Sequence, residues 1–179
     1  LQARAASGEP VRLWSAGCSS GEEPYSIAMT LAGTDLPSAR WLDRDVRLLA
    51  TDLSEPMVQA TARARYTSLA ADQVPLPYRA VWLREEGSNV VVADHLVRLV
   101  TTRQLNLFGH WPFSRRFDAI FCRNVMIYFD AEARRELELR LLEQLRPGGY
   151  LYIGHSERLS AEAAAATTSC GQTIYQKKS

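Results

Sequence analysis

The sequence VRLWSAGCSSGEEPYSIAM, residues Val11–Met29, decides the fold. It begins with a short apolar run suited to a β-strand, continues through the small residues of Ser15–Gly21 and turns helical from Pro24. Strand, tight turn and helix start in this order are typical of an open α/β sheet, where backbone N–H groups at a helix N-terminus can face a ligand. Small residues let a ligand approach the backbone closely. The stretch therefore predicts a ligand-binding loop after a first strand.

Two carboxylates, Glu22 and Glu23, stand where this helix begins. The loop is not a P-loop, because no Gly-Lys-Ser/Thr follows it, and Gly17 and Gly21 do not form the G-x-G-x-x-G pattern of a dinucleotide site. Carboxylates repel phosphate and suit hydroxyl, amine or sulfonium groups, which favours an adenosyl ligand without phosphates. The alternative is that both glutamates only complement the helix dipole, worth about 0.3–1 kcal/mol each. The local sequence leaves both interpretations open.

The composition limits the classes of function. A chain of 179 residues suits one domain, and its net charge of +1 gives no electrostatic reason to expect nucleic acid or an anionic membrane surface. No apolar run reaches the roughly 20 residues of a membrane helix, and no signal peptide is recognised. The cysteines, Cys18, Cys122 and Cys170, have no metal-site or disulfide-framework spacing. We therefore expect three small apolar side chains in a protein of the reducing cytoplasm.

The rest of the chain alternates predicted strands and helices, which favours a doubly wound, mostly parallel sheet. We expect further strands at Val46–Ala50, Phe117–Cys122, Tyr150–Gly154 and Thr173–Gln176, and helices at Met57–Arg65 and from Asp130 to Leu145. Pro147-Gly148-Gly149 is predicted to be the turn that ends the long helix, and Leu1–Pro10 an irregular terminus.

One long segment interrupts the alternation. Val81–Leu83 and Val90–Ala93 flank the polar turn Gly87-Ser88-Asn89, which is a hairpin signal, and Val97–Thr102 is a further run rich in β-branched residues. We expect a small antiparallel β insertion at about residues 79–97. The connection is longer than those usual in such folds, and a long loop of this kind is either functional or a simple decoration.

Polar side chains follow several predicted strands. Asp52 ends the second strand, where a carboxylate commonly binds the two hydroxyls of a ribose, although a lone aspartate there can also be a turn or cap residue. Asn106 follows another strand and could meet the edge of a base.

Arg123 and Asn124 close the Phe117–Cys122 strand at the carboxyl end of the sheet. The segment after them, Val125–Phe129, is apolar except for the phenol of Tyr128. An amide at this place could hold a polar group of the ligand while the aromatic rings exclude water. The alternative is an Asn-led turn packed by core aromatics.

The sequence offers weak support for other chemistry. His155-Ser156-Glu157 is not interpreted as a catalytic triad, because the three are adjacent and the nucleophile elbow G-x-S-x-G is missing. His95 and His110 make no metal-ligand spacing with any cysteine or carboxylate, so no metal site is predicted.

Four segments, in this order and spacing, resemble the CheR-type family of chemotaxis-receptor glutamate O-methyltransferases: LWSAGCSSGEEPYSIAM, LLATDLSEPM, FDAIFCRNVMIYFD and LRPGGYLYIGHSE. SSGEEPYS and CRNVMIYF are specific, whereas LRPGG occurs in many class I methyltransferases. The resemblance implies one class I SAM-dependent methyltransferase domain over residues 1–179, with a Rossmann-like sheet and the small β insertion. It implies S-adenosylmethionine as cofactor and S-adenosylhomocysteine as product.

The resemblance also implies partners and site residues. The partner is the cytoplasmic region of methyl-accepting chemotaxis receptors, with no nucleic acid and no membrane insertion. Glu23 is expected to contact the cofactor, Asp52 its adenosine, and Asn106 and Leu107 the adenine. The implied catalytic pair is Arg123 and Tyr128, and the full implied cofactor-binding set is Glu23, Asp52, Asn106, Leu107, Arg123 and Asn124.

The chain departs from the family ahead of its first strand, because the family's upstream helical domain and its Asn-x-Thr-x-Phe-Phe-Arg linker are not found there. We therefore expect a fragment or a shortened relative. The insertion looks like the β-subdomain by which some members bind a receptor's tether peptide, but it has no close motif match. Two other functions stay open: a signalling module that binds the cofactor without catalysis, and a methyltransferase of the same type with a different acceptor.

Overall fold

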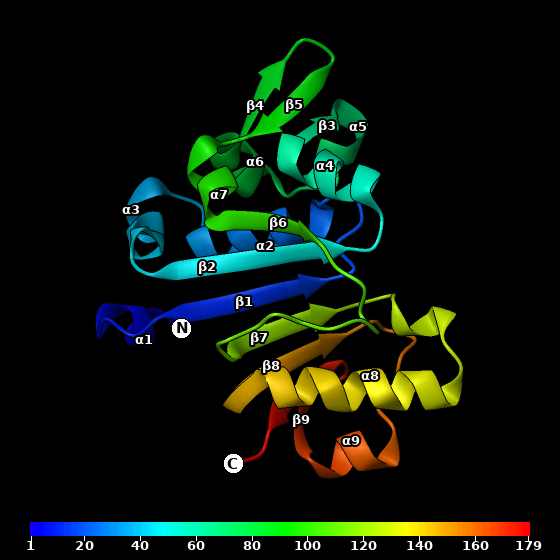
Figure 1. The fold of residues 1–179 in the computed structure, drawn as a ribbon. Coiled ribbons are helices and arrows are strands. Elements are labelled where there is room, and N and C mark those ends of the chain that lie inside the picture. Colours follow the sequence, from blue (N-terminus) through cyan, green and yellow to red (C-terminus); the bar gives the residue numbers. More distant parts are fainter.

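The computed structural model describes residues 1–179. Its centre is a seven-stranded sheet in the order β6-β2-β1-β7-β8-β10-β9 (Figure 1). Five strands are parallel, namely β6 (Val100–Gln104), β2 (Val46–Asp52), β1 (Val11–Ala16), β7 (Phe117–Cys122) and β8 (Leu145–Ile153). The last two, β10 (Ile174–Lys177) and β9 (Thr167–Gly171), are antiparallel to their neighbours. This confirms the predicted doubly wound, mostly parallel sheet.

Helices bury both faces of the sheet. On one face Val11 and Leu13 of β1 pack in a core with α2 (Glu22–Ala32) and α7 (Asp94–Leu99). On the other face Trp14 of β1 packs in a second core with α8 (Ala131–Gln144) and α9 (Ala161–Ala165). Successive side chains of a strand point to opposite faces, so a strand covered on both sides is apolar throughout. This explains the almost wholly apolar β7, as predicted.

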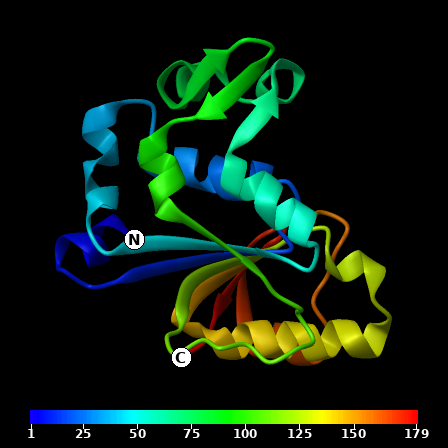
Figure 2. The same cartoon turned by 45° about the horizontal axis from the view of Figure 1, so that its top comes forward.

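A three-stranded antiparallel sheet in the order β3-β5-β4 lies on the outer side of α2 and α4 (Glu55–Arg63), away from the main sheet (Figures 1 and 2). It is formed by β3 (Arg65–Thr67), β4 (Leu83–Glu86) and β5 (Asn89–Val92), with α5 (Ser68–Ala71) and α6 (Leu76–Trp82) between its first two strands. The predicted hairpin turn at Gly87-Ser88 is present. Trp82 and Val92 belong to the same core as α2. The small sheet is thus packed onto the main body.

Two stretches that were expected to be strands are partly helical. Val81 and Trp82 end α6, and Val97–Leu99 end α7, so that β6 begins only at Val100. Leu96 and Leu99 are three residues apart and both are buried, which is the helical spacing. Burial of this face outweighs the β-preference of the branched side chains.

The N-terminal and C-terminal regions also differ from the sequence expectations. Leu1–Pro10 contains α1 (Gln2–Ala6), which is held by an ion pair between Arg4 and buried Asp118. Near the other end, β9 is a polar edge strand without apolar alternation, and it exposes Cys170. Cys18 and Cys122 are buried, as suits the small apolar side chains expected of the cysteines, whereas Cys170 is exposed.

The expected turn at Pro147-Gly148-Gly149 is instead an irregularity within β8, which starts directly after α8 at Leu145. A Cβ at Gly149 would lie 2.9 Å from the Arg146 carbonyl and 3.1 Å from the Asp118 carbonyl, so only glycine lets the neighbouring strand approach. Three shorter elements complete the fold: α3 (Leu36–Ala39), η1 (Arg40–Asp43) and η2 (Met126–Tyr128). None of the helices has the length and apolar character needed to cross a bilayer.

Candidate functional site

The carboxyl ends of the parallel strands bring the predicted site residues to one edge of the sheet. The loop from Gly17 to Gly21 follows β1, Asp52 ends β2, Asn106 follows β6, and Arg123 follows β7. Because β6, β2, β1 and β7 are consecutive neighbours, these four positions lie along a single edge. Open α/β sheets bind their ligands at this edge.

The loop after β1 is fixed to the end of β2 by backbone hydrogen bonds. The N–H groups of Gly17 and Cys18 donate to the Thr51 carbonyl at 2.8 and 2.9 Å. Gly17 has φ +78°, and a Cβ there would lie 2.5 Å from Cγ2 of Val125. The loop therefore needs glycine at this position both for its backbone conformation and for contact with the segment after β7.

Asp52 links the loop to the next helix. One carboxylate oxygen accepts the Ser19 N–H at 2.8 Å, and the other accepts the Ser54 N–H at 2.9 Å. This is the turn role that the sequence left open, and Ser54 is the N-cap residue of α4 without a side-chain capping bond of its own. A carboxylate has about four acceptor sites, so both oxygens can still accept a ligand hydroxyl.

Glu23 and Glu22 differ in their surroundings. One oxygen of Glu23 accepts the Ser15 hydroxyl at 2.7 Å, and the other lies 3.5 Å from Nη1 of Arg123. Burial raises the pKa of Glu23, while the Ser15 hydrogen bond and the Arg123 charge act to lower it. Glu22 is exposed and accepts the Ser20 hydroxyl. Glu23 is the one bonded to β1 through Ser15, and a cationic ligand group beside it would favour its carboxylate form.

Two pockets meet at this edge. The first, here called the Asp52 pocket, has a volume of about 330 Å³ and the second, the Glu23 pocket, about 800 Å³. Both volumes fall within the roughly 300–1,000 Å³ of typical ligand sites. The two pockets share Gly17, Ser19 and Asn124. They therefore adjoin across the β1 loop and could hold two parts of one ligand.

All seven predicted site residues line these pockets. Asp52, Asn106, Leu107 and Tyr128 line the Asp52 pocket, Glu23 and Arg123 line the Glu23 pocket, and Asn124 lines both. The amide oxygen of Asn106 accepts the Phe108 N–H at 2.9 Å, which leaves its NH₂ group to donate to a ligand. Leu107 is almost fully buried, whereas Tyr128 is 79% exposed at the rim. The roles of these residues toward a ligand stay predictions.

Glu157 is a positioning residue that sequence reasoning missed. It is 2% exposed, and its carboxylate accepts the backbone N–H groups of Asn124 at 3.3 Å, Met126 at 2.9 Å and Gly154. Asn124 has φ +58°, in the left-handed region. Glu157 thus holds the turn after β7 in the conformation that lines both pockets. A glutamate shortly after an apolar strand was the only signal, and nothing in the periodicity predicted its burial.

The family profile described as "CheR methyltransferase, SAM binding domain" matches residues 1–175. The chain belongs to this family. It is 44% identical over 181 residues to a probable chemotaxis protein methyltransferase of Rhizobium etli. The aligned region covers 98% of this chain and 66% of that protein. It is 39% identical over 171 residues to chemotaxis protein methyltransferase 2 of Pseudomonas aeruginosa, covering 93% of this chain and 59% of that protein. The chain spans less than two thirds of either relative.

Solved structures agree with the family at the level of the fold. The crystal structure of the DszA carbon methyltransferase aligns with a TM-score of 0.53 and 19% identity, over 82% of this chain and 29% of that chain. The structure of PKMT2 from Rickettsia typhi in complex with AdoHcy aligns with a TM-score of 0.50 and 16% identity, over 85% of this chain and 24% of that chain. The predicted family and methyltransferase fold are confirmed, and the family's cofactor is S-adenosylmethionine.

Proposed function

We propose that this chain is the catalytic domain of a protein-glutamate O-methyltransferase. Its acceptors are glutamate side chains in the cytoplasmic region of chemotaxis receptors, and its products are methyl esters and S-adenosylhomocysteine. The observation that carries this proposal is the meeting of seven residues, on four separate segments, at two adjoining pockets beside the β1 loop. The relatives named as chemotaxis protein methyltransferases support the choice of acceptor.

The residues present fit the cofactor. In the Asp52 pocket, the Asp52 carboxylate would accept ribose hydroxyls, and the Asn106 amide would donate to the adenine, beside the apolar side chain of Leu107. In the Glu23 pocket, the partly buried Glu23 carboxylate would attract the positively charged end of the molecule. No lysine or arginine lines the Asp52 pocket, which agrees with a ligand that carries no phosphate there.

Alignment and exclusion of water are the contributions we assign to the protein. When bound, S-adenosylmethionine supplies an electrophilic methyl group on a sulfonium centre. A glutamate acceptor is ionised at neutral pH, so no side chain has to remove a proton. Arg123 carries a positive charge 3.5 Å from Glu23 and would orient the acceptor carboxylate, and Tyr128 would close the rim against water. One S–C bond breaks and one O–C bond forms, leaving a neutral sulfide and an ester.

Incubation with methyl-labelled S-adenosylmethionine and receptor cytoplasmic fragments tests the proposal. The expected result is label on glutamate that mild base releases as methanol, together with loss of transfer in the Asp52→Ala variant. Binding of S-adenosylhomocysteine without any transfer would instead favour a non-catalytic signalling module. Label on another molecule, identified by mass spectrometry, would show a different acceptor.

We also infer that residues 1–179 are one domain in which the small sheet is an insertion. The support for this is that Trp82 and Val92 share a buried core with α2.

A further inference from the structure

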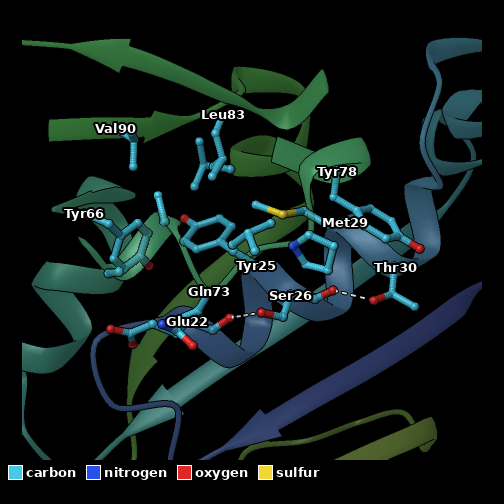
Figure 3. A pocket seen from close by; sticks show the side chains of 15 residues that line it. Glu22, Tyr25, Ser26, Met29, Thr30, Tyr66, Gln73, Tyr78, Leu83 and Val90 are labelled. Atoms are coloured by element: carbon cyan, nitrogen blue, oxygen red, sulfur yellow. Dashed lines mark hydrogen bonds between the residues drawn. The ribbon is translucent and has the colours of Figure 1, made fainter. Parts of the chain in front are cut away.

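A third pocket lies between α2 and the small sheet (Figure 3). It shares Glu22, Ser26 and Thr30 of α2 with the Glu23 pocket. This α2 pocket has a volume of about 430 Å³, which is sufficient for a small organic molecule. Its walls come mainly from apolar and aromatic side chains, including Tyr25, Met29, Tyr66, Tyr78, Leu83 and Val90. Tyr25 and Met29 come from α2, and Leu83 and Val90 face them from the β4–β5 hairpin. Nothing in the proposed methyl transfer uses this cavity.

The α2 pocket carries a single negative charge, at one margin of its lining. Glu22 is the single charged side chain in its lining, and it lies with Ser26 at one margin, while Leu83 and Val90 form the opposite margin (Figure 3). Close by, the rings of Tyr25 and Tyr66 meet edge to face with centroids 6.2 Å apart. Aromatic faces attract organic cations, and a carboxylate pairs with them. The pocket therefore fits an apolar body that carries one positive charge.

The walls of the α2 pocket are hydrogen-bonded to the loop that borders the candidate active site. The Tyr66 hydroxyl donates to the Ser20 carbonyl at 3.0 Å, and the Tyr25 hydroxyl donates to the Thr61 carbonyl at 2.9 Å. The Thr61 hydroxyl in turn donates to the Ser19 carbonyl at 3.0 Å. Burial raises the pKa of both tyrosines, so both remain protonated donors at neutral pH.

The loop has little freedom to move independently of these walls. Gly21 has φ +100°, and a Cβ there would lie 2.7 Å from the Tyr66 hydroxyl and 2.9 Å from the Thr61 side chain. The same loop is held to Asp52 through the Ser19 N–H. A molecule that packs against Tyr25 and Tyr66 would therefore restrict the loop that lines the Asp52 pocket.

We propose that the α2 pocket binds a small organic cation, an ammonium group on an aryl or alkyl body, and that its occupancy strengthens binding at the Asp52 pocket through Tyr66 and the β1 loop. The ligand orders Tyr25 and Tyr66 and with them the carbonyls of Ser19 and Ser20. The coupling is reciprocal, because each ligand must change the affinity of the other by the same factor.

The test uses 4-phenylbutylammonium as the probe, with 4-phenylbutanol and 4-phenylbutyrate as neutral and anionic counterparts of the same body. NMR titration is expected to shift the amide signals of α2 and the small sheet, with the cation binding most tightly and the anion most weakly. Glu22→Gln removes the preference for the cation, and Glu22 is exposed, so the fold tolerates the change. Because Glu22 also lines the Glu23 pocket, the loss is read from the amide signals of the small sheet, which lines the α2 pocket alone. Glu85→Gln is the matched control, because the Glu85 side chain is 83% exposed and outside the pocket lining.

The coupling is measured by calorimetry of S-adenosylhomocysteine with and without saturating probe. A tightening of about fivefold or more is expected, at the lower end of usual allosteric couplings. Equal binding of cation and anion, no binding of any probe, or an unchanged S-adenosylhomocysteine affinity with the probe bound would each overturn the proposal. A dimer in sedimentation that Leu83→Trp disrupts would also overturn it, because a second copy would then cover the pocket.

Discussion

Replacing Glu157 by glutamine separates a positioning role from a merely structural one. The Glu157 carboxylate accepts three backbone N–H groups at the turn after β7, and it is almost fully buried. Glutamine keeps one amide oxygen as an acceptor, but its NH₂ group cannot accept the remaining N–H groups. Hydrogen bonds to a charged group contribute about 1.5–3 kcal/mol, so we expect a loss of about 2 kcal/mol in the free energy of unfolding.

The same substitution should weaken cofactor binding, because Asn124 and Val125 line the Asp52 pocket and depend on this turn. We expect the Kd of S-adenosylhomocysteine to rise about tenfold, which corresponds to about 1.4 kcal/mol. The measurements are urea unfolding and calorimetric titration on the same preparations.

Glu138→Gln provides the matched control for this experiment. Glu138 is a second fully buried glutamate, on α8, and one of its oxygens accepts the Ser160 N–H at 2.9 Å, away from both pockets. The glutamine oxygen can keep this single hydrogen bond, so Glu138→Gln should lose less stability than Glu157→Gln and no affinity. An Asp52-pocket affinity that is unchanged in Glu157→Gln, or reduced equally in Glu138→Gln, would refute the positioning role.

Three further predictions concern single residues. Because burial raises the pKa of Glu23, this carboxyl keeps its proton to a higher pH than an exposed glutamate does. Affinity for the cationic S-adenosylmethionine should therefore increase as pH rises through that pKa. Over the same pH range the free energy of unfolding should fall, because the folded state holds this proton more tightly than the unfolded state does. In Glu23→Gln, calorimetric titration and calorimetric unfolding should show neither pH dependence. Iodoacetamide at neutral pH should modify the exposed Cys170 and spare Cys18, whose pKa burial raises to about 11; mass spectrometry finding alkylated Cys18 in folded protein would contradict this. Gly17→Ala should cost about 1–3 kcal/mol of stability and abolish cofactor binding, because the added Cβ meets Val125. A thermal melt and a titration within error of the original protein would argue against the close approach.

Much of the main sheet could be predicted because each parallel strand is a local apolar run. The run Phe117–Cys122 identifies a covered strand without knowledge of its neighbours, and the strand's end then places Arg123 and Asn124 at the ligand edge. The same reasoning applies to Asp52 at the end of β2. Once the strands are parallel, their carboxyl ends must lie together, which is why the candidate site residues converge.

The features that the sequence did not indicate depend on partners distant along the chain. α1 is held by the ion pair of Arg4 with Asp118. The buried Glu157 carboxylate accepts the N–H groups of Asn124 and Met126, which lie 33 and 31 residues before it, and that of Gly154. In the segment before β6, propensity favoured a strand, but burial of Leu96 at helical spacing favours a helix. Local pattern alone carries no information about such contacts.

Calorimetric titration of S-adenosylhomocysteine into the original protein and the Asp52→Ala variant tests the central claim, that the Asp52 pocket holds the adenosine. The reference is Asp72→Ala, which removes an exposed carboxylate paired with Arg79 outside the Asp52 pocket. We expect the Kd to rise at least about tenfold in Asp52→Ala, equivalent to about 1.4 kcal/mol, and to stay unchanged in Asp72→Ala. An Asp52→Ala variant that is folded and binds S-adenosylhomocysteine with the original affinity would contradict the claim.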